Sequence, residues 1–543
     1  MKKLKVVLRW TGRTLLVLLA TLALFILEEN LRGRIMLSRY KAELRAKGEK
    51  LTLAEMNTVL PRTEGSSNAE LGAAGRELSV IRKESQFDVW ALTRLRWIGP
   101  GRVIVRCRQP DLDVRWHDLP VKNGESRNLA TNGVAQPPRG RLNGQTPRTY
   151  VVMVADWGDL SERLDAASNA LACVRTALTN GEVFFPDQSV DYKSLQLGYQ
   201  EVESVRIWLA AAALNEIHDG KLDSAISDIS LLATLARVHR EERLMHGGGY
   251  RRIGIGEVGL DLTWEALQAP GWTDSRLSEL QAAWKTDDIL PDIIPALEVE
   301  RGFDIAFYDK IRSSFAEWQK VRRGMLSEYR RDTLFDIEVS LWFALWRVAW
   351  LDQSEEALLR KYQSLLEAAR DVVAGQAWNN VYHPPVGVDR RSYSYFNAGF
   401  GWFEQAWRVA MEFETRRQMT LTAIALKRFE LRYGHLPVNQ RELVPDFLPG
   451  LPRDYMTDQP LRYRLKDDGM FVLYSVGVDG HDDGGIPTPG QSSGPLNLYV
   501  LKLWEGVDAV WPVAATPEEI EAQELKWYTP EQVRRIRQAK ERK

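Results

Sequence analysis

Three aspartates close to the C-terminal end of the chain are the residues best suited to chemistry. Asp479, Asp482 and Asp483 lie within five residues of one another, in the segment YSVGVDGHDDGG, and glycines flank them. Carboxylate oxygens are hard ligands, and flanking glycines leave backbone carbonyls free, so the segment can wrap a hard cation. The spacing is not that of an EF-hand, and a solvated Asp/Gly turn explains the same residues.

Other motifs predict no chemistry. Residues 254–259 match the pattern GxGxxG, but the polar segment before them does not read as the buried strand that a dinucleotide site needs. We therefore expect these glycines to let helices approach closely. The seven histidines show no metal-ligand spacing, and the chain has neither a GxSxG elbow nor a P-loop lysine. The sequence predicts no catalytic and no cofactor-binding residue.

The segment before the aspartates predicts a helix, a short helix and a β-hairpin, in that order. Residues 419–433 predict an amphipathic helix that ends at the breaker sequence GHLP, and residues 442–448 predict a short helix. Residues 461–465 and 470–475 alternate in polarity around Asp467-Asp468-Gly469, which predicts a β-hairpin. The aspartate-rich segment follows this hairpin directly.

This order resembles the C-terminal half of the major pseudopilin of type II secretion systems, over about seventy residues. In that family a helix, a leucine-rich helix, a turn and a hairpin precede a glycine- and aspartate-rich loop that binds calcium. The resemblance implies a small α+β domain at residues 416–515, with Asp479, Asp482 and Asp483 as calcium ligands. It also implies a structural or docking role.

The N-terminal part departs from that family. The chain lacks the pseudopilin leader, and about 390 residues separate its N-terminal apolar segment from the pseudopilin-like helix. Filament assembly is therefore not implied. The wider layout, with an apolar start, a Trp-rich helical body and a pseudopilin-like end, resembles bacterial membrane-anchored envelope proteins.

The first 28 residues predict a membrane anchor. Residues 14–27 read TLLVLLATLALFIL without a charge and span only ~21 Å as a helix, short of a ~30 Å hydrocarbon core. Extension upstream to Leu4 closes that gap if the basic side chains snorkel to the headgroups. An uncleaved signal anchor is the leading interpretation; a cleaved signal peptide and a buried cytoplasmic helix are the alternatives.

The charges around this segment predict its orientation. Residues 1–13 hold five basic residues and no acidic one, so the N-terminus stays in the cytoplasm and the bulk of the chain lies outside it. We expect a single-pass protein of the bacterial inner membrane. In that oxidising space Cys107 and Cys173 either pair or remain two buried thiols.

Residues 151–415 predict an irregular helical array. Residues 195–217 and 222–238 carry apolar stripes joined at Gly220, which predicts a helix hairpin with some resemblance to one tetratricopeptide unit. Further helices are expected at 253–267, 273–284, 294–325, 335–373 and 400–433. Residues 341–351 are too few to span a membrane, so we expect the central helix of the array, with Arg347 meeting a carboxylate or carbonyls. A second span is the alternative.

Length and composition limit the number of folded units and the class of protein. With 543 residues the chain needs several folded units, and 72 basic against 73 acidic residues exclude a globally basic nucleic-acid coat. Its 19 tryptophans predict large apolar contacts. Residues 29–150 predict a stalk helix, a mixed segment and a long loop. Residues 516–543 predict a basic terminal helix, which we expect to be solvated; no nucleic-acid partner is expected.

Together these patterns predict a mainly α fold: an irregular array of helix hairpins, a small C-terminal α+β pseudopilin-like domain and one N-terminal transmembrane helix. The leading hypothesis for function is a non-enzymatic envelope protein that presents a surface to an envelope or secretion partner. The alternative is an extracytoplasmic hydrolase or glycan-processing enzyme with a site between helices. Converging carboxylates with raised pKa values in a cleft would favour the enzyme.

Overall fold

The structure is a computed structural model. It describes residues 2–56, 66–84, 96–99, 102–104, 157–180, 192–238, 250–285, 288–329, 333–384, 400–486 except 468 and 478, 508–519 and 522. This part of the chain is mainly helical, with a few small sheets. The long loop expected within residues 29–150, Cys107 and nearly all of the expected terminal helix lie outside the described residues.

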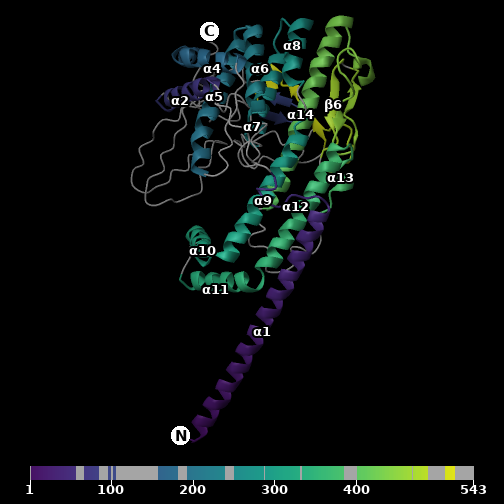
Figure 1. Cartoon of the computed structure of the whole chain (residues 1–543). Helices are drawn as coiled ribbons and strands as arrows, with labels where there is room; N and C mark the ends of the chain where they lie inside the picture. Colours follow the sequence, from purple (N-terminus) through teal and green to yellow (C-terminus); the bar gives the residue numbers. More distant parts are fainter. Residues whose placement is uncertain are drawn as a thin grey trace.

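Helix α1 (Lys2–Ala46) is continuous across the expected boundary between anchor and stalk. Its N-terminal part is long and apolar enough to cross a membrane, and no residue in that apolar window is buried by the rest of the protein. The helix is closed by a turn at Gly48, whose φ of +84° lets Glu49 donate its backbone N–H to the carbonyl of Leu44. Figure 1 shows α1 projecting far beyond the body.

The first half of the body is built on the predicted hairpin. Helices α5 (Tyr192–His218) and α6 (Leu222–Val238) pack together, and Gly220 adopts a φ of +73° in the turn between them. Helix α4 (Ser168–Asn180) and α3 (Trp157–Ala166) pack beside them. Helix α2 (Ser66–Glu84), from the segment expected to be mixed, joins this group, and its Leu78 carbonyl accepts a hydrogen bond from Trp208.

The second half is built on longer helices. Helices α7 (Tyr250–Leu267), α8 (Asp274–Trp284), α9 (Leu290–Ser313), α12 (Leu351–Val373) and α14 (Phe400–Tyr433) share one apolar core with the first half. The short α13 (Trp378–Val381) follows α12. Among the described tryptophans, Trp208, Trp264, Trp346, Trp407 and Trp284 are almost completely buried, which agrees with the expected role of the tryptophan excess in packing.

Two helices that the sequence predicts as continuous are broken. The backbone becomes extended at Ser314, which separates α9 from α10 (Phe315–Tyr329) and whose hydroxyl accepts the N–H of Glu317. A second break at Trp350 separates α11 (Thr333–Ala349) from α12. Both breaks allow α10 and α11 to fold across the lower end of the body in Figure 1.

The prediction of a central helix at 341–351 is wrong. Helix α11 lies at the edge of the body: its Phe343 and Trp346 pack inward, whereas Leu341 is 67% exposed, because the break at Trp350 bends the chain out of line with α12. The prediction for Arg347 is confirmed: its guanidinium donates to the carbonyls of Ile311 and Arg312.

The GxGxxG segment lies inside helix α7. A Cβ atom at Gly256 would lie 2.5 Å from the ring of Phe413 on α14, and one at Gly259 would lie 2.7 Å from Trp284 on α8. These glycines therefore let α14 and α8 approach α7 closely, as the sequence predicts.

The C-terminal unit contains the predicted hairpin. Strands β5 (Arg462–Leu465) and β6 (Phe471–Ser475) pair antiparallel, and β7 (Ala509–Val510) extends their sheet. Strands β3 (Arg453–Asp454) and β4 (Gln459–Pro460) form a second ladder after the short 3-10 helix η4 (Gln440–Leu443). In Figure 1 these strands lie beside α14.

Two features tie this unit to the array. Helix α14 crosses the boundary expected at residues 415 and 416, and Arg416 pairs with Asp261 of α7 at 2.5 Å. In addition, β8 (Val513–Ala514) pairs in parallel with β2 (Arg102–Ile104), which pairs with β1 (Arg96–Gly99). The unit is therefore packed into the array rather than linked to it by a tether.

The glycines of α7 give a test within one motif. We expect Gly256→Ala to destabilise the protein by about 1–3 kcal/mol, because the new methyl group meets the Phe413 ring. Gly254→Ala is the matched control: a Cβ there meets nothing within 4 Å, so it should be neutral or stabilise by up to about 1 kcal/mol. Thermal unfolding of both variants measures the difference, and equal effects would contradict this packing role.

Candidate functional site

The predicted aspartates lie in a loop that follows β6. Asp482 accepts hydrogen bonds at Oδ1 from the Tyr474 hydroxyl and the Gly484 N–H, both at 3.0 Å, and at Oδ2 from Arg462 at 3.3 Å. Although partial burial acts to raise it, these donors hold the pKa of Asp482 below its usual value. Gly485 packs against the Tyr474 ring, where a Cβ would lie 2.9 Å away.

A fourth aspartate, Asp508, was not predicted from the sequence and bonds the backbone of this loop. Asp508 is buried and accepts the N–H groups of Asp483 and Gly485 at 3.4 and 2.7 Å. Burial raises the pKa of Asp508, against the effect of these hydrogen bonds. Asp508 lies 23 residues after Gly485, and nothing in its local sequence pattern signals this contact.

The three predicted ligands have separate partners. Asp479 accepts the backbone N–H of His481 at 2.9 Å, and Asp483 lies 3.8 Å from the His481 ring. Within the described part of the chain, no three His, Cys, Asp or Glu side chains are grouped so that they could hold a metal ion. A cation bound at this loop would have to replace the hydrogen bonds that these carboxylate oxygens now accept. Calcium binding therefore stays a prediction.

A second set of polar residues lies where α1 meets the body. They belong to the contact between residues 25–33 of α1 and residues 348–353. Glu29 is only 5% exposed; its carboxylate accepts from Trp350 at 3.0 Å, and its carbonyl accepts from Gln353 at 2.6 Å. Asn30 donates to the carbonyl of Val348 at 2.8 Å.

One stripe of α1 that follows its apolar segment is buried against α12 and against Ile305 of α9. Its members recur at three- and four-residue steps and are Glu29, Gly33, Leu37, Tyr40 and Leu44. Gly33 is needed for close approach, since a Cβ there would lie 2.2 Å from Oε1 of Gln353. The expected stalk is thus docked on the body, and the spacing of this stripe is the sequence signal that could have revealed it.

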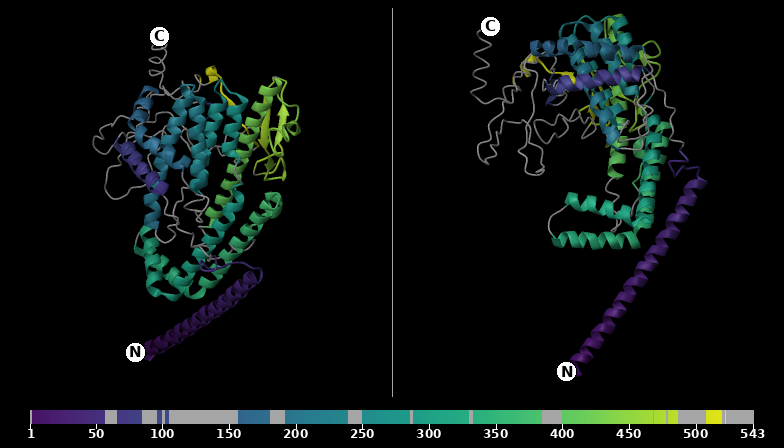
Figure 2. Two further views of the ribbon diagram at one scale, coloured as in Figure 1. Left: turned by 45° about the horizontal axis from the view of Figure 1, so that its top comes forward. Right: turned by 60° about the vertical axis from the view of Figure 1, so that its left-hand side comes forward.

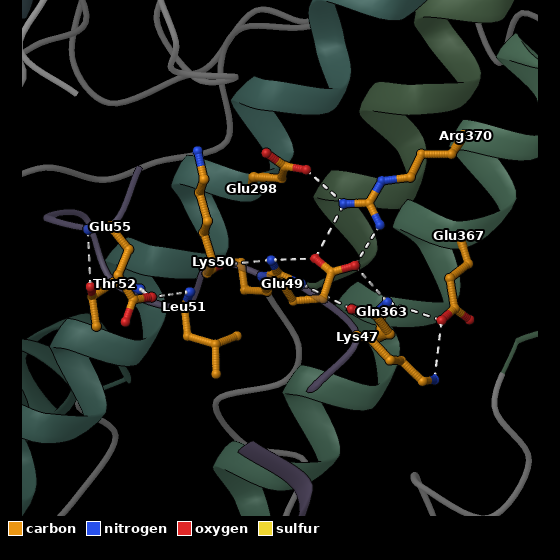
Figure 3. A network of polar contacts seen from close by, with 11 residues as sticks. Lys47, Glu49, Lys50, Leu51, Thr52, Glu55, Glu298, Gln363, Glu367 and Arg370 are labelled. Atoms are coloured by element: carbon orange, nitrogen blue, oxygen red, sulfur yellow. Dashed lines mark hydrogen bonds and ion pairs between the residues drawn. The ribbon is translucent and has the colours of Figure 1, made fainter. Parts of the chain in front are cut away.

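The far end of α1 is held by a network around Glu49 (Figure 3). Arg301 of α9 is fully buried and donates to Glu49 at 2.9 Å. Arg370 of α12 donates to both Glu49 and Glu298, while Gln363 bonds Arg301 and Glu49. Burial raises the pKa of Glu49, but the hydrogen bonds from Arg370, Gln363 and Arg301 outweigh it and lower the pKa to about 2.

One pair of carboxylates elsewhere has an unusual protonation equilibrium. Glu216 and Asp228 converge on Arg175, which binds both oxygens of Asp228. Burial, together with the charge of Asp228, raises the pKa of Glu216 to about 8. Within the described residues, this arrangement has the converging carboxylates that the enzyme hypothesis requires.

Comparison of the chain with protein-family models, with curated proteins and with solved structures found no match. The pseudopilin resemblance therefore stays a prediction, and the functional argument depends on the geometry alone.

The Glu49 network predicts a pH dependence. Because the pKa of Glu49 is lower in the folded than in the unfolded protein, its contribution to stability is present above about pH 4.5 and is lost as the pH falls towards 2. We expect Glu49→Gln to lower the free energy of unfolding at pH 7 by about 3–5 kcal/mol. The variant should also lose less stability than the wild type as the pH falls from about 4.5 towards 2. Glu43→Gln, an exposed control on α1, should change neither. Parallel pH profiles for Glu49→Gln and wild type would contradict the assignment.

Proposed function

We propose that this protein is a single-pass membrane protein whose α1 anchors a rigid, extracytoplasmic helical body that binds an envelope or secretion partner. The observation that carries the proposal is the docking of α1, whose apolar half is free of the body while its polar half is bound to it at both ends. Because α1 is docked in this way, its position in the membrane sets the position of the body.

Rigid attachment suits a scaffold. From Glu29 to Ala46 the docked half of α1 rises ~27 Å along the body. Lys41 pairs with Glu355, and Arg360 stacks on the Tyr40 ring at 4.2 Å, so the middle of this half is bound as well. A partner that binds the upper helices or the C-terminal unit would therefore meet them at a constant height and orientation.

The C-terminal unit is the proposed docking module. It presents a sheet and the aspartate loop at one side of α14, and the same order of elements underlies the pseudopilin resemblance. We propose that calcium stabilises this loop through Asp479, Asp482 and Asp483. Support comes from the density of carboxylates and glycines there.

A hydrolase or glycan-processing enzyme is the second candidate. Glu216, with a pKa of about 8, would be protonated near neutral pH and could serve as a general acid. Asp228, however, is fully engaged by Arg175, in the manner of an ion pair that joins helices. The scaffold is therefore the function that the geometry supports better.

The prediction of a buried thiol is wrong for Cys173, which is free and exposed on α4, so this cysteine can be used to test the topology. In a Cys107→Ser background, a membrane-impermeant maleimide should label Cys173 in spheroplasts under reducing conditions, because the body lies outside the cytoplasm. A Cys107→Ser/Cys173→Ser variant gives the background signal. Labelling that requires lysis would refute the extracytoplasmic placement.

Calcium binding is best tested on the whole chain, because α14 is packed into the array. If the proposal holds, millimolar calcium but not magnesium raises the melting temperature of the wild type, by the linkage of binding to folding. Asp482→Asn should abolish the shift. Asp467→Asn, in the exposed turn of the same hairpin, should retain it. A wild-type melting temperature that is indifferent to calcium would remove the ion from the proposal.

A further inference from the structure

Helix α11 carries an apolar stripe on its outward face. Leu341 and Val348 are 67% and 42% exposed and lie two helical turns apart, with the partly exposed Leu345 between them. Arg347 is the one charged residue between positions 340 and 349, and its guanidinium is bonded to the carbonyls of Ile311 and Arg312. In this stretch of α11, therefore, the exposed side chains that face water are apolar.

The end of this stripe is attached where the apolar part of α1 ends. Asn30 bonds the carbonyl of Val348, and the rings of Phe25 and Trp350 meet edge to face, with centroids 6.4 Å apart. The uncharged run of α1 ends at Leu27, two residues before the buried Glu29. If α1 spans a membrane up to Leu27, the surface of that membrane lies at the level of Val348.

The arrangement of the helices agrees with this level. Helices α10 and α11 form the edge of the body towards which the apolar half of α1 extends, and α1 is the one described helix that continues beyond that edge (Figures 1 and 2). Helix α11 runs across the direction of α1 rather than alongside it. Phe315, at the start of α10, is 61% exposed and lies beside Arg347.

We propose that α11 lies in the outer interface of the same bilayer that α1 spans, with Leu341, Leu345 and Val348 inserted among the lipids. This inference rests on the proposed function, because it needs α1 to span the membrane. Helices in the interface bury their apolar face about 5–10 Å into the boundary between headgroups and acyl chains. Tryptophans are enriched at this depth, and Trp342 and Trp350 flank the stripe.

The bilayer is a better occupant of this stripe than a second copy of the chain. Through Phe25 and Trp350 the stripe is continuous with the apolar surface of α1, which the bilayer must cover in any case. Three aliphatic side chains and one phenylalanine are also few for a stable dimer, which buries about 800 Å² on each partner. The body would then have two membrane contacts, one spanning and one in the interface, and these two contacts fix its tilt.

The test uses the full chain, with Cys107 and Cys173 replaced by serine, in lipid nanodiscs. An environment-sensitive fluorophore is attached to Leu341→Cys, to Val348→Cys or to Leu18→Cys, and to Val438→Cys as an exposed control. Val438 is 74% exposed and follows α14, whose C-terminal end lies far from α11. We expect a nitroxide placed near the lipid headgroups to quench the labels at 341 and 348 at least about twofold, as for a probe in the interface. Iodide in the water should quench the label at 438 but not these two.

The labels separate the inference from the proposed function. If position 18 is quenched by a deep nitroxide lipid while 341 and 348 are as accessible to iodide as 438, the anchor stands and the interfacial position of α11 is overturned. If no position is quenched by lipid, both are overturned. If 341 and 348 are shielded from iodide without lipid quenching and each disc holds two copies, a second chain covers the stripe and the inference is likewise overturned.

Discussion

The burial of Glu29 against Gln353 and Trp350 is the contact on which the arrangement of this protein depends. An acidic residue at the end of an apolar run would ordinarily face water, and burying it unpaired would cost several kcal/mol. Here its carboxylate and carbonyl are bonded by α12 and the residue before it, so α1 continues from its apolar half into the body without a hinge. Gly33, one turn further on, allows the two helices to touch.

Buried arginines then fix the remaining helices relative to one another. Arg301, Arg416 and Arg417 are almost wholly buried; Arg301 of α9 pairs with Glu49 just beyond α1, Arg416 of α14 with Asp261 of α7, and Arg417 with Glu414 of its own helix. Such pairs add little net stability, because desolvation offsets their attraction, but losing one partner is costly. In an array without a sequence repeat, we infer that they define which helices are neighbours.

The sequence predicted those elements whose signals are local. Gly220 and the stripes beside it gave the α5–α6 hairpin, and alternation around Gly469 gave β5 and β6. It could not predict features set by distant partners. Ser314 and Trp350 interrupt helices whose apolar periodicity continues, so α11 was expected at the centre and lies at the edge. Asp508 contacts the aspartate loop from 23 residues away. Glu29 was predicted only as the end of a membrane segment, because its partner Gln353 lies more than 300 residues later.

The continuity of α1 can be measured directly by hydrogen exchange of the full chain in nanodiscs, followed by mass spectrometry of peptides from residues 28–46. Amide exchange reports the opening of backbone hydrogen bonds, so a docked helix exchanges as slowly as the helix on which it packs. Docking predicts that peptides from 28–34 are protected to the same degree as those from α12. Rapid exchange at 28–34, between a protected membrane segment and a protected body, would reveal a flexible tether and contradict a rigidly anchored scaffold.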